Sequence, residues 1–331
     1  MIESEILASI IIPVFNVELY LKECLDSIFI CQNTIHKFEV IVINDGSTDS
    51  SLNILDQYKV SYDFILINQK NEGISAARNA GIKAAKGKYL LFADSDDFFV
   101  PNALNKLLDS LATSEADIIE YDYDILYNTE SNFKKRGDPK VFSGTGQDVF
   151  CEWRKTRFYH SMVWTRAVSR SLVVSNHLFF YSNGCCEDVE WSPRIFAYAK
   201  SVSYFPLEVY TYRIRENSVT TSVYDPEKRA ECIAALVSLY KFSFTDGLSP
   251  RYVKTLREKI YTFYINFIKE IKINGEYNNS LIYALEENSC LMKCANSFHR
   301  KYIYRYFIDI FGIKFFYCFK YRVRWKFKYY K

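Results

Sequence analysis

Four short runs of apolar residues, separated by stretches with helical periodicity, dominate the first hundred residues. The runs span residues 10–14, 40–43, 64–67 and 89–93. Each run is apolar along its whole length, which is typical of a strand buried on both faces of a sheet. Strands of this kind that alternate with helices form a mostly parallel sheet covered by helices on both faces. The sequence therefore predicts a Rossmann-like α/β domain.

The second half of the chain is richer in helical patterns. Past Pro101 the alternation of strands and helices weakens, and from Pro226 onward the periodicity is helical. We therefore place a boundary after residue 224, with an α/β domain over 1–224 and a helical C-terminal extension over 225–331. The other expected elements are helices over 18–30, 49–58, 75–85, 101–112, 188–199, 226–244, 250–272, 278–296 and 300–320, strands over 118–125, 201–204 and 209–213, and a polar excursion over 128–147.

Composition and the N-terminus bear on the location of the protein. A hydrophobic content of 49% and a charged content of 24% are those of a folded globular chain. The nine cysteines show no metal-binding spacing, which fits reduced thiols in a cytoplasm. Glu3 and Glu5 stand where a signal peptide would be basic, and no uncharged apolar run is long enough to span a membrane. We expect a cytoplasmic protein.

The C-terminal tail is strongly basic and aromatic. Between His299 and Lys331 it has ten Lys and Arg residues and one acid, Asp309, whereas the rest of the chain carries an excess of acids. Cations beside aromatic side chains fit binding in the plane of an anionic lipid surface, which would make the protein peripheral on the inner face of the cytoplasmic membrane. A helix packed on the body of the protein fits the same pattern. We expect no nucleic-acid partner.

Clustered carboxylates follow the fourth apolar run, in the sequence Asp94-Ser95-Asp96-Asp97. Asp94 and Asp96 are two residues apart, so an extended backbone points both side chains the same way. Hard oxygen ligands suit Mg²⁺ or Mn²⁺ held against phosphate groups. A solvated acidic turn ahead of a helix that begins at Pro101 is the simpler alternative. Because ligands of parallel sheets bind at the carboxyl ends of the strands, we expect the loops after the four runs to converge on one crevice.

Four sequence blocks in the first hundred residues resemble a known family. They are SIIIPVFN (9–16), IVINDGSTD (41–49), NEGISAARNAG (71–81) and ADSDD (93–97). In this order and spacing they resemble the family 2 glycosyltransferases of the GT-A fold, in particular bacterial enzymes that make capsule, O-antigen or lipooligosaccharide. The resemblance covers roughly residues 8–222 and fades in the helical C-terminus. It implies a GT-A domain followed by an α-helical extension.

The resemblance implies a UDP-sugar site in the first three blocks. Asp45 would accept a hydrogen bond from the uracil ring; an aspartate in an Asp-Gly turn is the alternative. Pro13 and Phe15 would line the nucleotide, with the ring of Phe15 either stacked on the base or packed in the core. Gly73 would let the backbone approach the nucleotide. Arg78 would supply a cation near the diphosphate or uridine, unless it is a solvated helix residue.

The fourth block implies a metal site. Asp94 would contact the ribose and lie beside the metal, Asp96 would ligate Mn²⁺ or Mg²⁺, and Ser95 would belong to the nucleotide-sugar site. Asp97 would support these residues from behind. The metal would bridge both phosphates and neutralise the nucleoside diphosphate as it leaves.

Two later segments complete the predicted site. Glu187-Asp188 resembles the Glu-Asp motif of the family, so Asp188 would be the general base, with Glu187 orienting it or touching the acceptor. Acids favoured at a helix N-terminus by the helix dipole would look the same. Arg213 and Arg215 would close over the diphosphate, although exposed arginines at the end of a strand would show the same pattern.

The predicted activity is inverting transfer of a hexose or N-acetylhexosamine from a UDP-sugar to a hydroxyl of a lipid-linked bacterial surface glycan. A sugar-1-phosphate nucleotidyltransferase would need a glycine- and arginine-rich loop after Ile12, and a Rossmann dehydrogenase would need Gly-x-Gly-x-x-Gly there; neither is present. A membrane-associated protein that binds nucleotide sugars or glycans without catalysis is the remaining alternative. Intact Asp96 and Asp188 argue against it.

Overall fold

The computed structural model describes residues 6–31, 36–127, 130–131, 139, 144–181, 186–215, 226–269, 272–273, 276–277 and 279–294. The chain divides into two compact units, Met1–Ser182 with Glu187–Val223, and Asn183–Cys186 with Tyr224–Lys331. The predicted assignment of 1–224 as a catalytic domain and 225–331 as a helical extension with a basic tail stays a prediction.

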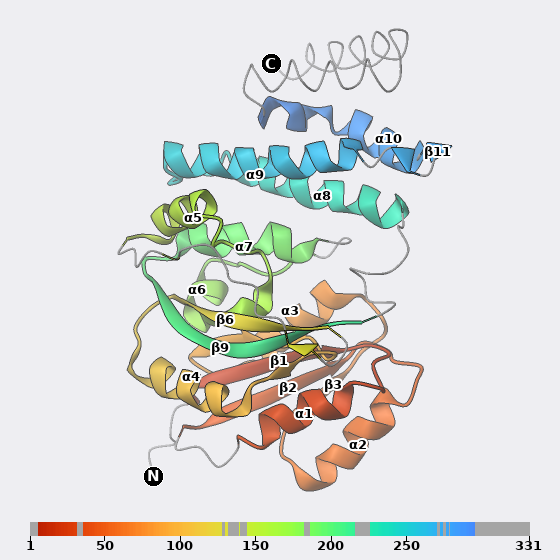
Figure 1. The fold of residues 1–331 in the computed structure, drawn as a ribbon, viewed down its shortest axis with the longest axis vertical. Coiled ribbons are helices and arrows are strands. Elements are labelled where there is room, and N and C mark those ends of the chain that lie inside the picture. The colour runs from red at the N-terminus through yellow and green to blue at the C-terminus, as the bar shows by residue number, and fades with distance from the viewer. Residues whose placement is uncertain are drawn as a thin grey trace. The chain divides into compact units, whose positions relative to one another are not determined.

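The described strands of the first unit form one nine-stranded sheet in the order β3-β2-β1-β4-β8-β6-β9-β5, with β7 paired to β6 (Figure 1). The four predicted apolar runs are β1 to β4, and they pair in parallel. β8 runs antiparallel to both β4 and β6, so the sheet is mixed rather than mostly parallel. The strands are β1 (Ala8–Val14), β2 (Phe38–Asn44), β3 (Ile65–Asn68), β4 (Tyr89–Phe92), β5 (Phe98–Phe99), β6 (Ile118–Tyr127), β7 (Glu130–Ser131), β8 (Arg166–Ser169) and β9 (Val202–Ile214).

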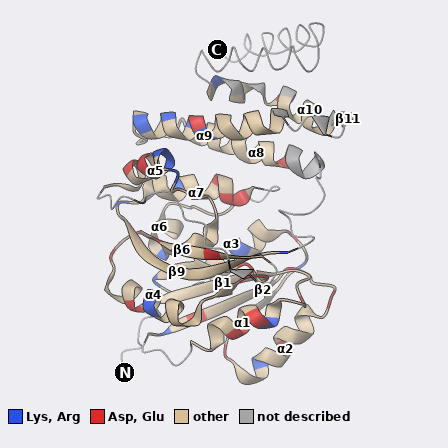
Figure 2. Ribbon diagram, viewed as in Figure 1, with Lys and Arg blue, Asp and Glu red and all other residues tan. Residues whose placement is uncertain are grey.

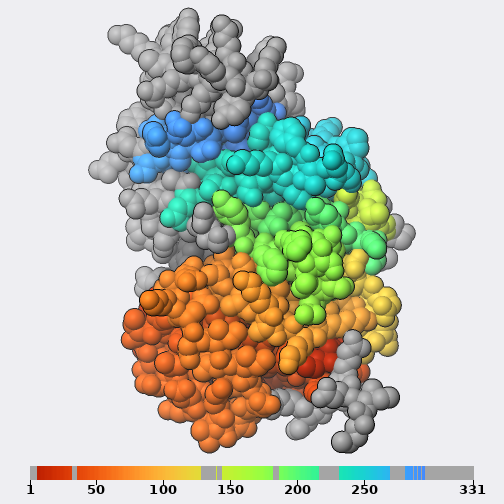
Figure 3. All heavy atoms as spheres, turned by 180° about the vertical axis from the view of Figure 1, so that it is seen from behind, coloured from red at the N-terminus to blue at the C-terminus, as the bar shows by residue number. Residues whose placement is uncertain are grey.

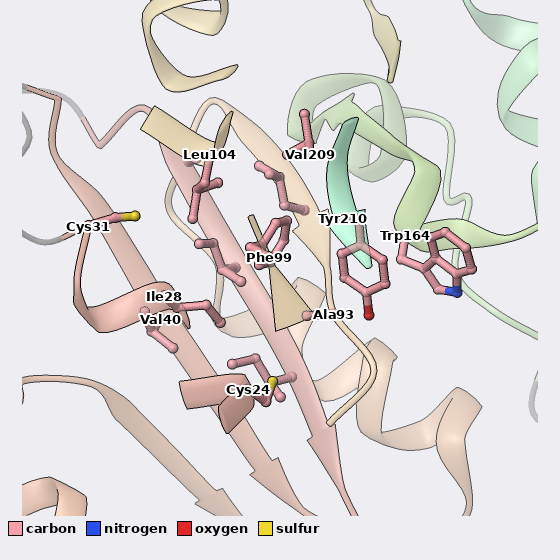
Figure 4. Close-up of a cluster of buried hydrophobic side chains, with 14 of the residues drawn as sticks. Cys24, Ile28, Cys31, Val40, Ala93, Phe99, Leu104, Trp164, Val209 and Tyr210 are labelled. Carbon is pink, nitrogen blue, oxygen red and sulfur yellow. The ribbon is translucent and has the colours of Figure 1, made fainter. Parts of the chain in front are cut away.

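Helices cover both faces of this sheet, as the sequence predicted. Alternate side chains of β1, such as Ile10 and Ile12, join a core with α1 (Leu21–Phe29), α2 (Ser51–Ser61) and α4 (Pro101–Thr113). In this core the ring of Tyr210 lies between two aromatic neighbours, edge-on to Phe99 at 5.2 Å and stacked on Trp164 at 4.7 Å (Figure 4). From behind, much of the surface of this unit is formed by its first hundred residues (Figure 3).

The opposite face of the sheet carries α3 (Ile74–Ala84) and α7 (Glu187–Tyr198). A Cβ atom placed on Gly81 of α3 would lie 2.4 Å from Cγ2 of Ile11, so the absence of a side chain brings α3 close to β1. The indole of Trp191 in α7 meets the ring of Phe92 in β4 edge-on, with 5.6 Å between centroids. These contacts hold the starts of α3 and α7 near the carboxyl ends of the parallel strands.

The predicted elements of the first unit agree with the structure except at two places. β3 is partly exposed, with Ile65 at 37%, because it is the edge strand. The predicted strands 201–204 and 209–213 are one strand, β9, whose pairing with β6 shifts register after Phe205. Pro206, which has no N–H for the ladder, stands at this irregularity and made one strand look like two.

Six described elements of the first unit were not predicted from the sequence: α5 (Gly146–Lys155), α6 (Arg170–Ser175), β5, β7, β8 and a 3₁₀ helix, Val163–Thr165. α5 had a recognisable N-cap, since the hydroxyl of Thr145 accepts a hydrogen bond from the backbone N–H of Asp148 at 3.4 Å. Most of the expected polar excursion over 128–147 lies outside the described residues.

The second unit contains α8 (Pro226–Phe242), α9 (Pro250–Lys269) and α10 (Asn279–Glu287), followed by a 3₁₀ helix, Ser289–Cys294. α9 ends three residues earlier than predicted, because Lys272–Ile273 pairs with Glu276–Tyr277 in a short hairpin. Buried residues of α9 recur every four positions, from Tyr252 to Tyr264, as expected of a helix with one apolar face. The predicted helix 300–320 and the basic tail lie outside the described residues. Within the described part of the chain, no helix combines the length and apolarity needed to cross a bilayer.

A buried ion pair joins the neighbouring strands β8 and β6. Nε of Arg166 lies 2.9 Å from Oε2 of Glu120, and each side chain is 1% exposed. Glu120→Gln leaves the arginine charge buried without its carboxylate, so we expect a loss of about 3 kcal/mol or more in the free energy of unfolding. Urea unfolding measures this loss.

The matched control is Glu115→Gln, which removes the exposed partner of Lys88. We expect a change within about 0.5 kcal/mol. Equal losses in the two variants would show that the buried pair contributes no more than a surface pair.

Candidate functional site

The acids that follow β4 form a tight turn tied to β9. The backbone N–H of Asp97 donates to the carbonyl of Asp94 at 3.0 Å. The carboxylate of Asp97 is 1% exposed and accepts from the hydroxyl of Tyr210 at 3.0 Å and from the backbone N–H of Arg213 at 2.8 Å. Burial raises the pKa of Asp97 well above its usual range, and the nearby charges of Asp94 and Asp96 raise it further. Asp97 therefore lies behind the other two acids and fixes the turn.

Tyr210 was not predicted as a site residue. Its hydroxyl donates to Asp97 and also accepts the backbone N–H of Asp94 at 2.9 Å, so it holds both ends of the acidic turn. Burial raises the pKa of Tyr210 well above its usual value, and Asp97 raises it further, so the hydroxyl stays protonated. An aromatic residue in an alternating strand pattern indicates core packing, and no feature of the sequence distinguished this one.

The two predicted arginines at the end of β9 reach the acidic turn. Nε of Arg215 donates to Oδ2 of Asp96 at 2.7 Å, and Nε of Arg213 donates to the main-chain oxygen of Asp96 at 3.1 Å. Arg213 also pairs with Glu23 of α1 at 2.6 Å. Both guanidinium groups lie over the ring of Tyr20, at 5.4 and 5.2 Å from its centroid. The structure thus brings Arg213 and Arg215 to Asp96. That they close over a diphosphate stays a prediction.

A second arginine contact joins the acidic turn to α7. Arg78 of α3 is 2% exposed; its Nη2 lies 2.7 Å from Oδ1 of Asp94, and its Nη1 lies 2.6 Å from Oε1 of Glu187. Burial raises the pKa of Asp94, and the charge of Arg78 opposes that rise. Arg78 is therefore buried and paired, which excludes the interpretation as a solvated helix residue.

The predicted general base lies in the first turn of α7, where the acids of this helix gather (Figure 2). Oδ1 of Asp188 accepts the backbone N–H of Val189 at 2.6 Å, and the side chain is half-buried. Glu187, next to it, is the partner of Arg78 and is 14% exposed at its side chain. One network therefore contains the acids after β4 and the residue adjacent to Asp188.

The loop after β2 is organised by the buried carboxylate of Asp45. Its Oδ1 accepts from Nε2 of Gln69 at 2.7 Å and from the backbone N–H of Glu72 at 2.9 Å, and its Oδ2 accepts from the N–H of Gly73 at 2.9 Å. Gly73 has φ 87°, in the left-handed region that favours glycine. A Cβ there would meet no atom within 4 Å, so the need for glycine is conformational rather than steric. Gln69 was not predicted; nothing in the sequence distinguished it from other polar loop residues.

The loop after β1 exposes an aromatic ring. Pro13 is buried in β1, whereas Phe15, just past the strand, is 44% exposed and so does not belong to the core. The amide oxygen of Asn16 accepts the backbone N–H of Thr48 at 2.8 Å and joins this loop to the one after β2. Ser95, in the acidic turn, is buried. Because β1, β2 and β4 are parallel neighbours, the loops that follow them lie at one edge of the sheet.

The oxygens of the acidic turn fit a divalent cation in part. Oδ2 of Asp94 and Oδ1 of Asp96 accept no hydrogen bond from the residues that the structure describes, whereas the other oxygen of each side chain pairs with an arginine. Two carboxylate oxygens suit Mg²⁺ or Mn²⁺ when phosphate and water supply the remaining ligands. No group of three His, Cys, Asp or Glu side chains in the described ranges could hold a metal by itself.

Comparison with known proteins identifies the family. The sequence profile of glycosyl transferase family 2 matches residues 9–173, which contain all four motif blocks and both β4 and β8. The chain belongs to this family. EpsH of Bacillus subtilis, named as a glycosyltransferase, is 30% identical over 215 residues, which cover 64% of this chain and 62% of EpsH. The poly(ribitol-phosphate) beta-glucosyltransferase of Bacillus spizizenii is 30% identical over 242 residues, which cover 71% of this chain and 37% of that protein. The chain thus spans less than two thirds of either relative.

The fold of this family 2 member matches that of a solved structure. The crystal structure of Staphylococcus aureus TarS 1–349 in complex with UDP-GlcNAc aligns with a TM-score of 0.67 and 20% identity, covering 88% of this chain and 82% of that chain. At this identity the likeness shows the fold alone. It confirms the predicted GT-A fold, with a mixed sheet, helices on both faces and helices in the C-terminal region.

Proposed function

We propose that this protein is an inverting glycosyltransferase that moves a hexose or N-acetylhexosamine from a UDP-sugar to a hydroxyl of a bacterial surface glycan. One observation carries the proposal: the ion pairs of Arg78 join Asp94, at the expected donor site, to Glu187, next to the expected base. A transferase needs its donor and acceptor groups side by side, and two motifs 93 residues apart in sequence meet here. Membership of glycosyl transferase family 2 supports the same activity.

The donor nucleotide would lie along the loops after β1 and β2. The exposed ring of Phe15 offers a face on which a base can stack, and Pro13 lies at the end of the same strand. Asp45 presents a buried carboxylate whose Oδ2 has a single described donor, Gly73, which leaves capacity for the N–H group of uracil. A solved relative carries UDP-GlcNAc, which supports uridine as the base and an N-acetylhexosamine as one candidate sugar.

The diphosphate would lie against the acidic turn. Asp94 would contact the ribose, with Ser95 beside it, and Asp96 with Asp94 would hold Mn²⁺ or Mg²⁺. When bound, the cation offsets the charge that builds on the diphosphate as it leaves. Arg213 and Arg215 would add donors to the same phosphate oxygens.

The acceptor would lie beside the first turn of α7. Asp188 accepts the proton of the acceptor hydroxyl while the hydroxyl oxygen forms its bond to the anomeric carbon. The bond from that carbon to the diphosphate breaks on the opposite side, so the configuration inverts and UDP leaves. Glu187 orients Asp188 or contacts the acceptor sugar.

A surface glycan is supported as the acceptor class by a relative named for transfer to poly(ribitol-phosphate). Attachment of the acceptor to a lipid, the cytoplasmic location and membrane contact through the basic tail belong to the same proposal. They would place the enzyme where a lipid-linked glycan is assembled.

A panel of UDP- and GDP-sugars tests this function. With Mn²⁺ or Mg²⁺ we expect release of UDP from one UDP-sugar, and NMR of the transfer product should show inversion at the anomeric carbon. Release of GDP instead would reassign the donor, and a retained configuration would remove the single displacement. Nucleotide binding without release of UDP from any sugar would favour the non-catalytic binding protein.

Arg215 pairs with Oδ2 of Asp96, so its positive charge lies beside Oδ1 of the same carboxylate, which a cation would approach. We expect Arg215→Ala to bind Mn²⁺ roughly 5-fold more tightly than wild type in the absence of nucleotide, because this positive charge no longer opposes the cation. In the presence of Mn²⁺ we expect it to bind UDP roughly 10-fold more weakly, since a charged donor to the diphosphate is lost. Isothermal titration calorimetry measures both affinities.

The control for this prediction is Arg194→Ala, which removes an arginine that pairs with Glu190 on α7 and has no contact with Asp96. It should leave both affinities unchanged. Tighter binding of Mn²⁺ together with weaker binding of UDP in Arg215→Ala would support the prediction. Equal losses of both affinities would indicate that Arg215 only stabilises the turn.

A further inference from the structure

Arg78 has two different carboxylate partners and almost no access to solvent. Its terminal nitrogens donate to Asp94 at 2.7 Å and to Glu187 at 2.6 Å, while 2% of the residue is exposed. Burial disfavours a charged arginine, but the two carboxylates outweigh this and raise the pKa of Arg78. Each terminal nitrogen of Arg78 thus donates to a protein carboxylate.

The backbone around Arg78 is held to the segment that leads to α7. The side-chain amide of Asn79 donates to the carbonyl of Phe180 at 2.9 Å and accepts the N–H of Phe180 at 2.8 Å. The guanidinium of Arg78 lies over the ring of Phe180, at 5.4 Å, and that ring stacks on Trp191 of α7 at 4.5 Å. Neighbouring residues of α3 therefore fix both the acid at the start of α7 and the aromatic layer beneath it.

The start of α3 is held to the loop after β2, where the nucleotide is expected. The N–H of Gly73, which precedes α3, donates to Asp45, and the backbone of α3 lies against β1 at Gly81. A rigid helix thus runs from the expected uracil-binding carboxylate to the arginine between Asp94 and Glu187. A shift of either carboxylate would break one arm of the guanidinium fork.

We propose that Arg78 is a positioning residue that sets the distance between the donor carboxylate Asp94 and the acceptor-side pair Glu187-Asp188. This inference rests on the proposed function and goes beyond it, because it assigns Arg78 to the alignment of two half-sites instead of to contact with the nucleotide. Misplacement of reacting groups by about 1 Å costs roughly 10²-fold in rate. Arg78 therefore contributes to turnover rather than to donor affinity.

Arg78→Lys tests this role, because lysine keeps the charge but cannot reach both carboxylates as a planar fork. With Mn²⁺ and the UDP-sugar that gives the fastest release of UDP, we expect kcat to fall roughly 50-fold, with KM for the donor and Kd for UDP within about 3-fold of wild type. The matched control is Arg194→Lys. Arg194 is also largely buried, contacts the carbonyl of Phe179 and Glu190, and touches neither site carboxylate. Its kcat should stay within about 3-fold of wild type.

A double-mutant cycle with Glu187→Gln separates positioning from a merely structural role. If Arg78 acts through Glu187, the double variant should be no slower than the slower single variant. If the fold-losses in kcat of the two single variants multiply in the double variant, the inference is overturned. A loss in Kd for UDP that matches the loss in kcat would also overturn it, because Arg78 would then contact the nucleotide.

Melting temperatures of the same variants test the network without any substrate. Glu187→Gln should lower the melting temperature less in the Arg78→Lys background than in wild type, because the ion pair between residues 78 and 187 is already weakened there. Equal losses would overturn the inference. A wild-type protein that neither binds UDP with Mn²⁺ nor releases UDP would instead refute the proposed function, and the melting data would still report on the network.

Discussion

Asp188→Asn is expected to lower kcat roughly 10³-fold while leaving the affinity for UDP with Mn²⁺ within about 2-fold of wild type. The amide keeps the size of the side chain and can still accept the N–H of Val189, which Oδ1 accepts at 2.6 Å. It cannot take the proton of an acceptor hydroxyl, and general-base catalysis is worth about 10²–10⁴-fold. Steady-state release of UDP in the presence of acceptor, together with calorimetric titration of UDP, measures the two effects.

The control for this substitution must account for the position of Asp188 at a helix start. Asp148 occupies the first turn of α5 as Asp188 occupies that of α7. Asp148→Asn should lose a similar small amount of stability from the helix dipole and retain full turnover. If both variants keep wild-type kcat, Asp188 is only a favourable first-turn acid, and another group takes the proton.

Asp96→Asn is expected to weaken the binding of UDP in the presence of Mn²⁺ roughly 10²-fold and to change binding in the absence of metal by less than about 3-fold. The substitution removes one of the two carboxylates that face the expected cation and leaves Arg215 with a neutral partner. Calorimetric titration of UDP with and without Mn²⁺ separates the two conditions.

Asp26→Asn is the control for the loss of a carboxylate that accepts a hydrogen bond. Asp26 is exposed on α1 and accepts the hydroxyl of Tyr58, so its loss should leave both titrations unchanged. An Asp96 variant with the same metal dependence as wild type would show that the cation, if used, is held by other residues.

The parallel half of the fold was predictable because its information is local. Each of β1, β2 and β4 contains a continuous apolar run and lies beside a helix with its own periodicity, so neighbouring residues suffice to indicate the element. β8 is a four-residue strand containing Arg166, whose charge is buried only because Glu120 stands on the neighbouring strand. A pairing across 46 residues leaves no trace in the local pattern.

The sequence predicted which residues belong to the site better than it predicted which of them contact one another. The motif blocks named Asp45, Arg78, Asp94 and Asp96, and a later segment named Asp188. The structure places the loops that carry Asp45, Asp94 and Asp96 at one edge of the sheet. That Arg78 pairs with two acids at once depends on where α3 and α7 pack, which no single segment encodes. Tyr210 and Gln69 were not predicted for the same reason, since their hydrogen-bond partners lie 113 and 24 residues away in the sequence.

The irregular pairing after Phe205 decides which way the end of β9 points. Up to Glu208, which pairs with Asp122, each residue of β9 pairs with a residue of β6 whose number has the same parity. From Tyr210 onward, which pairs with Tyr123, the parities are opposite. Paired residues point to the same side, so the change of parity is what directs the hydroxyl of Tyr210 toward the acids. The number of residues between Phe205 and Tyr210 is therefore more strictly constrained than the identity of the residues in that segment. Losing one residue there would turn Tyr210 away, whereas many replacements of side chains would not.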